Sequence, residues 1–201
     1  MIAIIDYGAG NLHSVQKGFE KVGAKATVTS DPGQVAAARA VVLPGVGSYG
    51  LAMQSLERLG LTRVLTDVIR GGKHFLGICL GLQVLLEGSE EALGSTGLGI
   101  IPGRVRRFPG GLKVPHMGWN QLYFARQDPL FEGVEPGAWF YFVHSYYADP
   151  RDEEWVLGRA DYGVPFTAAL GKGNVRAVQF HPEKSGRLGL KVLANFVGLM
   201  N

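Results

Sequence analysis

Residues 75–83 read FLGICLGLQ and join an apolar strand directly to a helix. The run Phe75–Ile78 predicts a buried strand, and we expect a helix from Leu80 to about Ser89. Cys79, the only cysteine of the chain, lies at the junction, with a glycine two residues before it and another two residues after it. This pattern is typical of a nucleophile elbow, a sharp turn in which side chains at the two glycine positions would clash.

Three further strand-and-helix units precede this segment. Strands are predicted over residues 2–5, 25–29 and 40–43, and helical patterns start at the caps Asn11 and Asp31 and run over residues 48–59 and 62–70. A β-strand followed by a helix, repeated four times, predicts a parallel sheet with helices on both faces.

The pattern changes after Gly94. Short alternating or aromatic-rich segments follow at residues 114–124, 139–146, 155–161 and 166–170, separated by Gly, Pro and Asp. We expect antiparallel hairpins that extend the same sheet, and a last helix over residues 184–199. The predicted fold class is therefore α/β, with a central, mostly parallel sheet covered by helices on both faces and extended by antiparallel strands. No linker interrupts the pattern, so we expect one domain over residues 1–201.

Composition excludes several classes of protein. Hydrophobic residues make up 46% of the chain and charged residues 18%, which is typical of a folded protein and not of a disordered one. No apolar run approaches the roughly 18 residues that a membrane-spanning helix needs. The single cysteine excludes an intrachain disulfide, and no basic segment precedes the first apolar residues, so we expect a cytoplasmic protein without a signal peptide.

Nucleic-acid, dinucleotide and metal binding are not expected. The net charge is +3, and we interpret the basic stretch Arg104–Arg107 as a solvated β-hairpin. The segment Gly8-Ala9-Gly10, with Asp31 further on, imitates a dinucleotide fingerprint, but His13 stands where the third glycine belongs. No two histidines, and no histidine with the cysteine, have the spacing of metal ligands on one helix or hairpin.

A thiol nucleophile needs a base and a group that orients the base. His181 follows a predicted strand, in the segment Gln179-Phe180-His181-Pro182-Glu183. Because residues i and i+2 of an extended segment face the same way, we expect Glu183 to lie beside the His181 ring and to fix its tautomer. The simpler interpretation is a turn between a strand and a helix. The four other histidines, at positions 13, 74, 116 and 144, have ordinary surface or hydrogen-bonding interpretations.

Residues 77–83, GICLGLQ, together with residues 179–183, QFHPE, resemble the paired signature of the class I, or triad, glutamine amidotransferases. The resemblance implies a flavodoxin-like fold and a glutaminase reaction without a cofactor. A cysteine thiolate attacks the side-chain amide of L-glutamine, a histidine protonates the leaving ammonia, and water hydrolyses the γ-glutamyl thioester. The resemblance also implies that Cys79 is the nucleophile, His181 the general acid and base, and Glu183 the orienting group.

Four further motifs, at residues 6–12, 43–47, 115–120 and 141–146, resemble the branch of this family that serves histidine biosynthesis. In that branch the glutaminase subunit forms a heterodimer with a (β/α)8-barrel synthase subunit, which receives the ammonia. Two alternatives stay open. One is a glutaminase subunit of another amidotransferase, such as the vitamin B6, anthranilate or carbamoyl phosphate systems. The other is a non-catalytic scaffold that binds a partner.

The same resemblance implies which residues bind glutamine. They are Gly45, Val46 and Gly47 as an oxyanion strand, the Leu80 amide as a second oxyanion donor, and Gln83, Glu91, Ser145 and Tyr146 at the ends of the substrate, with Glu91 pairing its α-ammonium group. The simpler interpretation of Gln83 and Glu91 is that of exposed helix residues. Because glycines flank Val46, we also expect a peptide plane of this segment to be able to rotate.

Partner binding is expected at a small set of residues, because exposed aromatic side chains concentrate binding energy. The set is Asn11, Met117, Trp119 and Asn120, with Trp119 as its anchor. The simpler interpretation of Trp119 is a buried core residue.

Overall fold

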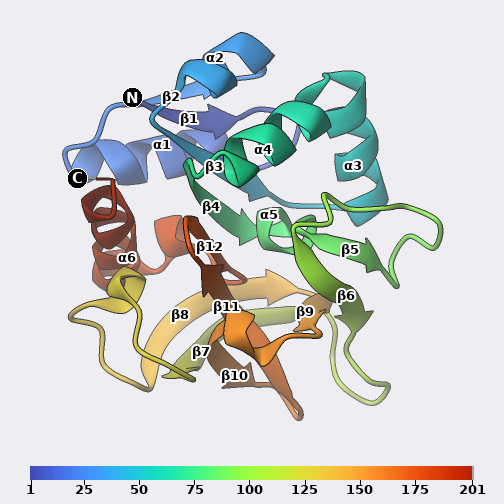
Figure 1. The fold of residues 1–201 in the computed structure, drawn as a ribbon. Coiled ribbons are helices and arrows are strands. Elements are labelled where there is room, and N and C mark those ends of the chain that lie inside the picture. The colour runs from blue at the N-terminus through green and yellow to red at the C-terminus, as the bar shows by residue number, and fades with distance from the viewer. Residues whose placement is uncertain (201) are drawn as a thin grey trace.

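Short apolar segments form the parallel half of the sheet in the computed structural model, which describes residues 1–200 (Figure 1). The strands are β1 (Ile2–Ile5), β2 (Ala26–Thr29), β3 (Ala40–Gly45), β4 (His74–Cys79) and β12 (Val175–Val178). They lie in the order β2-β1-β3-β4-β12, and every neighbouring pair is parallel. This is the strand order of flavodoxin-like sheets, so the predicted fold class is confirmed.

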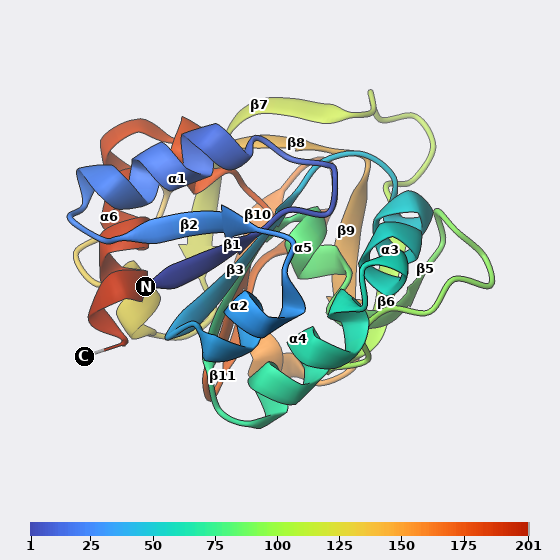
Figure 2. The same cartoon turned by 90° about the horizontal axis from the view of Figure 1, so that it is seen from above.

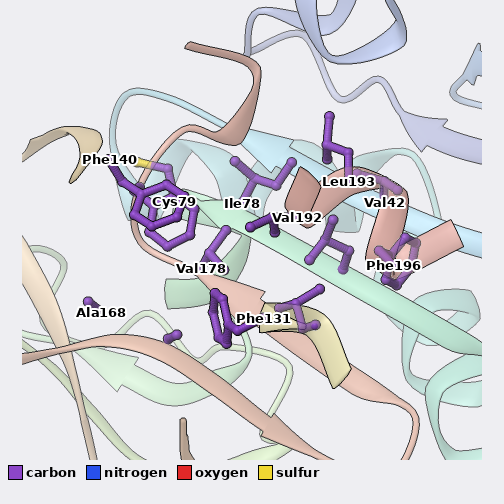
Figure 3. Packing of buried hydrophobic residues seen from close by; sticks show 14 of the residues in the cluster. Val42, Ile78, Cys79, Phe131, Phe140, Ala168, Val178, Val192, Leu193 and Phe196 are labelled. Carbon is purple, nitrogen blue, oxygen red and sulfur yellow. The ribbon is translucent and has the colours of Figure 1, made fainter. Parts of the chain in front are cut away.

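Helices cover both faces of the parallel strands (Figure 2). They are α1 (Leu12–Lys21), α2 (Pro32–Ala37), α3 (Tyr49–Arg58), α4 (Leu61–Arg70) and α6 (Gly186–Gly198). Helices α1 and α6 contact each other on one face, and α4 contacts both α2 and α3 on the other. Each face has its own hydrophobic cluster, and Figure 3 shows the cluster in which Val192 and Phe196 of α6 pack with Val42 of β3.

Two helix caps were predicted, and only one forms. Asp31 accepts a hydrogen bond from the Gln34 N–H at the start of α2, as expected of an N-cap. Asn11 holds the N-cap position of α1, but its side chain makes no hydrogen bond to the helix. Its ψ of 62° departs from the extended backbone that aims an N-cap oxygen at the helix, which explains the difference.

Antiparallel strands extend the sheet beyond β12, as predicted. The order continues through β11 (Pro165–Lys172), β10 (Val156–Asp161), β7 (His116–Phe124) and β8 (Ala138–His144). A branch is formed by β5 (Leu86–Ser89), β6 (Ile101–Arg107) and β9 (Tyr146–Pro150), and β9 also pairs with β11. Three 3-10 turns complete the structure: η1 (Pro129–Phe131), η2 (Glu153–Trp155) and η3 (Pro182–Lys184).

Two predicted boundaries and one predicted hairpin in this part of the chain were wrong. The helix expected from Leu80 to about Ser89 ends at Gln83 as α5 (Leu80–Gln83), and the chain then forms β5. The carbonyls of Val84 and Leu85, which would continue the helix, instead accept hydrogen bonds from the returning segment 98–101. This pairing competes successfully with helix propensity because it also buries the whole apolar run.

The segment predicted as one strand over residues 139–146 is two strands, broken at Ser145. Strand β8 pairs with β7 as far as His144, and β9 pairs with β6 from Tyr146 onward, so the chain changes partners at Ser145. The basic stretch Arg104–Arg107 is likewise not a hairpin but part of β6, which lies between β5 and β9. Its solvated character is confirmed, since Arg106 forms ion pairs with acidic neighbours at the surface.

The parallel strands determine where chemistry can occur. The register pairs Gly45 of β3 with Cys79 of β4, and Val178 of β12 with Ile78 of β4. The carboxyl ends of three neighbouring strands therefore meet at one edge of the sheet, where ligands of open α/β sheets bind. Over residues 1–200, no helix is long and apolar enough to cross a membrane.

Candidate active site

Cys79 occupies a strained backbone position at the end of β4. Its φ of 55° makes it the one non-glycine residue with a positive φ among residues 1–200. The flanking glycines are required by space. A Cβ on Gly77 would lie 2.6 Å from the Gly81 carbonyl oxygen, and a Cβ on Gly81 would lie 1.7 Å from the Leu43 carbonyl oxygen. The predicted steric reason for the Gly-x-Cys-x-Gly pattern is confirmed.

His181 and Glu183 form a buried pair. The His181 Nδ1 lies 2.8 Å from the Glu183 Oε1, and both side chains are 2% exposed. The backbone of His181 is held from two sides, because its N–H donates to the Tyr141 carbonyl and its carbonyl accepts from the Ser185 hydroxyl. The expectation that residues i and i+2 of this segment face the same way is confirmed.

The electrostatic environment keeps the His181 ring charged. Burial acts to lower the pKa of His181, but the side chains of Cys79 and Glu183 together raise it to about 10. Nδ1 faces Glu183, and Nε2 is buried without a hydrogen-bond partner. At neutral pH the ring is therefore an imidazolium that lies between a carboxylate and the cysteine sulfur, with a proton available at Nε2.

A cavity of about 400 Å³ opens at Cys79. Its size suits a small molecule. The lining residues are Val46, Gly47, Cys79, Leu80, Gln83, Glu91, Pro115, Val143, His144, Ser145, Tyr146 and Lys184. Seven of the eight residues expected to bind glutamine are among them, and the eighth, Gly45, lies next to Val46 at the end of β3. His181 and Glu183 are not among the lining residues.

Both expected oxyanion elements adjoin Cys79, since Leu80 follows it in the chain and Gly45 of β3 pairs with it in the sheet. Leu80 is the first residue of α5, where a helix leaves its N–H groups without intrahelical partners. Gly47 has a φ of 100°, a conformation that favours glycine, whereas Gly45 has no positive φ. Gly45 is needed for space, because a Cβ there would lie 2.0 Å from the Tyr7 hydroxyl. The expected rotation of a peptide plane in this segment stays a prediction.

Gln83 and Glu91 are not the exposed helix residues of the simpler interpretation. Gln83 is 4% exposed, and its Nε2 donates to the Tyr146 carbonyl at 2.9 Å and to the Gln179 Oε1 at 3.1 Å. Glu91 follows β5, and its Oε2 accepts a hydrogen bond of 2.8 Å from the Tyr49 N–H at the start of α3. Glu91 also lines the cavity.

Sequence reasoning missed three residues of the site. Gln179 is fully buried and donates from Nε2 to the Cys79 sulfur at 3.5 Å. The period of two that placed Glu183 beside His181 could have found Gln179 as well, since it lies two residues before His181. Lys184 lines the cavity and lies above the Tyr141 ring. Burial lowers the pKa of His144 to about 3, so this cavity residue is neutral, and no sequence pattern indicated it.

Of the four expected partner-binding residues, two lie on one exposed face of β7. Met117 and Trp119 are 64% and 51% exposed on one face of β7, so Trp119 is not a core residue. Asn120 alternates to the other face, where its Nδ2 donates to the Asp161 carbonyl. Asn11 is exposed at the start of α1.

Other surfaces of the molecule offer less chemistry. A larger groove of about 1070 Å³ runs between α3, α4 and residues 92–98, but it contains neither the cysteine nor a histidine. Within the described residues 1–200, no group of three His, Cys, Asp or Glu side chains is placed to hold a metal ion.

Comparisons with known proteins agree with this geometry. The family model described as glutamine amidotransferase class-I matches residues 3–199. The imidazole glycerol phosphate synthase subunit HisH of Methanothermobacter thermautotrophicus is 58% identical over 200 residues, which cover 100% of this chain and 99% of that protein. The protein of the same name from Moorella thermoacetica is 53% identical, over 97% of this chain and 93% of its own.

Solved structures show the same fold. The structure of PurLQS from Thermotoga maritima matches with a TM-score of 0.78 and 20% identity, over 100% of this chain and 98% of that one. At this identity the likeness concerns the fold alone.

Gly81→Ala tests the steric basis of the elbow. The added Cβ meets the Leu43 carbonyl, a backbone atom that cannot move without displacing β3. We expect the free energy of unfolding, measured by urea denaturation, to fall by at least about 2 kcal/mol. Gly198→Ala in α6 is the matched control, because a Cβ there meets no atom within 4 Å. Its free energy of unfolding should stay within about 0.5 kcal/mol of wild type. Equal stability of the two variants would contradict the steric account.

Proposed function

The chain belongs to the class-I glutamine amidotransferase family, and on that premise we propose that it is the glutaminase subunit of an imidazole glycerol phosphate synthase. It hydrolyses L-glutamine to glutamate and ammonia. The ammonia passes to a synthase subunit that makes imidazole glycerol phosphate and aminoimidazole carboxamide ribotide in histidine biosynthesis. As part of the same proposal, residues 1–201 form one amidotransferase domain that acts in the cytoplasm. The single sheet supports the first statement, and the single cysteine supports the second.

One observation carries the proposal. The only thiol of the chain lines a cavity of about 400 Å³, and it lies beside an imidazole ring that is paired with a buried carboxylate and whose pKa is raised. A nucleophile, a proton donor and an orienting group are the three parts that acyl transfer through a thioester requires. Cys79, His181 and Glu183 are therefore assigned these roles in that order.

The first half of the reaction releases ammonia. The Cys79 thiolate attacks the side-chain amide carbon of glutamine, and the carbonyl oxygen becomes an oxyanion. The Leu80 N–H and an N–H of residues 45–47 stabilise this charge. This assignment is supported by the position of Leu80 at the start of α5 and by the pairing of Gly45 with Cys79 in the sheet. His181 then gives its Nε2 proton to the amide nitrogen. The carbon–nitrogen bond breaks, ammonia leaves, and a γ-glutamyl thioester remains on Cys79.

The second half of the reaction restores the enzyme. His181 is now neutral and takes a proton from a water molecule, which attacks the thioester carbon. The carbon–sulfur bond breaks, and the proton returns to the pair of Cys79 and His181. Glu183 keeps the ring in the same orientation in both halves, because its Oε1 faces Nδ1 throughout. Glutamate leaves through the cavity that Gln83, Glu91, Ser145 and Tyr146 line.

The exposed face of β7 and β8 is the proposed docking surface for a (β/α)8-barrel synthase subunit. Met117 and Trp119 on β7 lie opposite Val143 and Tyr141 on β8, so the four side chains share one face. Val143 also lines the cavity at Cys79. A partner bound here would therefore lie next to the site that releases ammonia.

The alternatives have less support. The curated relatives at 53% and 58% identity carry the name of the histidine-biosynthesis subunit, and these matches cover nearly the whole chain, which favours this branch over other amidotransferases. A non-catalytic scaffold would not need a strained cysteine beside a charged histidine and a buried carboxylate.

Cys79→Ala tests the assigned reaction. With glutamine as nitrogen source, we expect turnover of the complex with the synthase subunit to fall by about 10⁴-fold or more, because the nucleophile is lost. With ammonium as nitrogen source, synthesis should continue at the wild-type rate, because the synthase subunit needs only ammonia. Glutamine-dependent turnover that survives in the alanine variant would exclude Cys79 as the nucleophile.

Trp119→Ala tests the docking surface. We expect its dissociation constant for a purified barrel synthase subunit, measured by calorimetry, to rise at least about tenfold, because exposed tryptophans concentrate binding energy. Leu93→Ala is the matched control, since Leu93 is 84% exposed but lies in the 92–98 segment, away from β7 and β8. Unchanged affinity of folded Trp119→Ala would place the interface elsewhere.

The glutaminase activity of the wild-type chain should also rise when this partner and its nucleotide ligand bind.

A further inference from the structure

A buried chain of hydrogen bonds ends at the nucleophilic sulfur. Gln83 Nε2 donates to the Tyr146 carbonyl at 2.9 Å and to Gln179 Oε1 at 3.1 Å. Gln179 Nε2 in turn donates to Cys79 Sγ at 3.5 Å. Gln179 is fully buried and Gln83 is 4% exposed, so bulk water does not compete for these bonds.

The Tyr146 carbonyl fixes the direction of both hydrogen bonds that follow it toward the sulfur. A carbonyl oxygen only accepts hydrogen bonds, so the Tyr146 carbonyl requires the Gln83 amide to present its NH₂ group. That NH₂ group also faces Gln179, which must therefore present its oxygen to Gln83. The Gln179 amide then has only its own NH₂ group left for the sulfur. Neither amide can be turned over without placing two acceptors or two donors in contact.

We propose that Gln179 is a further catalytic residue, which donates a hydrogen bond to the Cys79 thiolate and holds the sulfur in place for attack on the substrate. This inference rests on the proposed glutaminase function and adds to it a residue outside the triad. The donor favours the charged form of sulfur, because a hydrogen bond to an anion stabilises that anion.

The hydrogen bond from Gln179 to Cys79 does something that the triad does not do. The Cys79 thiol donates to the Val143 carbonyl at 3.8 Å, an acceptor that serves only the protonated form. Once the Cys79 thiol loses its proton, the Val143 carbonyl cannot stabilise the thiolate, because a carbonyl oxygen has no hydrogen to donate. His181 must give its proton to the leaving ammonia and so cannot stabilise sulfur throughout the reaction. Gln179 keeps its donor at every stage.

The test is the alkylation of Cys79 by iodoacetamide, measured across a range of pH. Only the thiolate reacts, and the chain has no second cysteine, so the rate reports on this sulfur alone. The full chain is used, and no substrate or partner is needed. The titratable groups around the sulfur and its cavity are Tyr7, Glu91, His144, Tyr146, His181 with Glu183, and Lys184, and all of them stay unchanged in the variants below.

Two variants separate the sulfur bond from the bond to Gln83. Gln179→Met removes both, whereas Gln179→Glu keeps an oxygen for Gln83 and replaces the donor at sulfur with an acceptor. We expect both to slow alkylation at neutral pH by about tenfold or more. At high pH, where every chain is in the thiolate form, their rates should converge with the wild-type rate, because access to the sulfur is unchanged.

Gln16→Met is the matched control, since Gln16 donates to the Ala26 carbonyl far from Cys79, and its profile should match the wild type. If Gln179→Glu reacts like the wild type while Gln179→Met does not, Gln179 serves only to hold Gln83 and the proposal fails. It also fails if the rates are lowered equally at every pH, which indicates a change in access. Glutaminase activity of the wild-type complex is assayed in parallel, so that failure of the proposed function is recognised separately.

Discussion

The close approach of Gly81 to the Leu43 carbonyl fixes the end of β4 against the end of β3, and the position of Cys79 depends on this contact. Only a residue without a Cβ allows the chain to turn there, and the turn forces Cys79 to a φ of 55°. Strand β12 pairs with β4 on its other side and delivers His181 just beyond its end. Three parallel strands therefore place Cys79, residues 45–47 and His181 at one edge of the sheet.

Burial of charge is the second constraint on the site. His181 and Glu183 are both withdrawn from water, a state that is costly unless the charges pair. In the proposed reaction, the same burial excludes water that would weaken His181 as a proton donor. Neutral polar groups complete the site, among them His144 and the two glutamines.

The sequence predicted β1, β2, β3 and β4 well, because their short, largely apolar runs are bounded by Gly, Pro or a capping residue. It expected a strand before His181 but did not place that strand in the parallel half, and Arg176 interrupts the apolar pattern of β12. It also predicted the elbow and the pairing of His181 with Glu183, since both follow from spacing along one segment. It failed at Leu86–Ser89, where pairing with β6 competes with helix propensity, and at Ser145, where a strand changes partners. It assigned no role to Gln179, because the contacts of Gln179 with Gln83 and Cys79 join residues about 100 positions apart.

The central claim is that Cys79 carries the acyl group of glutamine during the reaction. Rapid acid quenching of the wild-type complex during turnover, followed by mass spectrometry of its peptides, measures this directly. The account predicts one γ-glutamyl group on the peptide that contains Cys79, which disappears on treatment with hydroxylamine. Full glutamine turnover with no adduct on that peptide, or with the adduct on another residue, would contradict it.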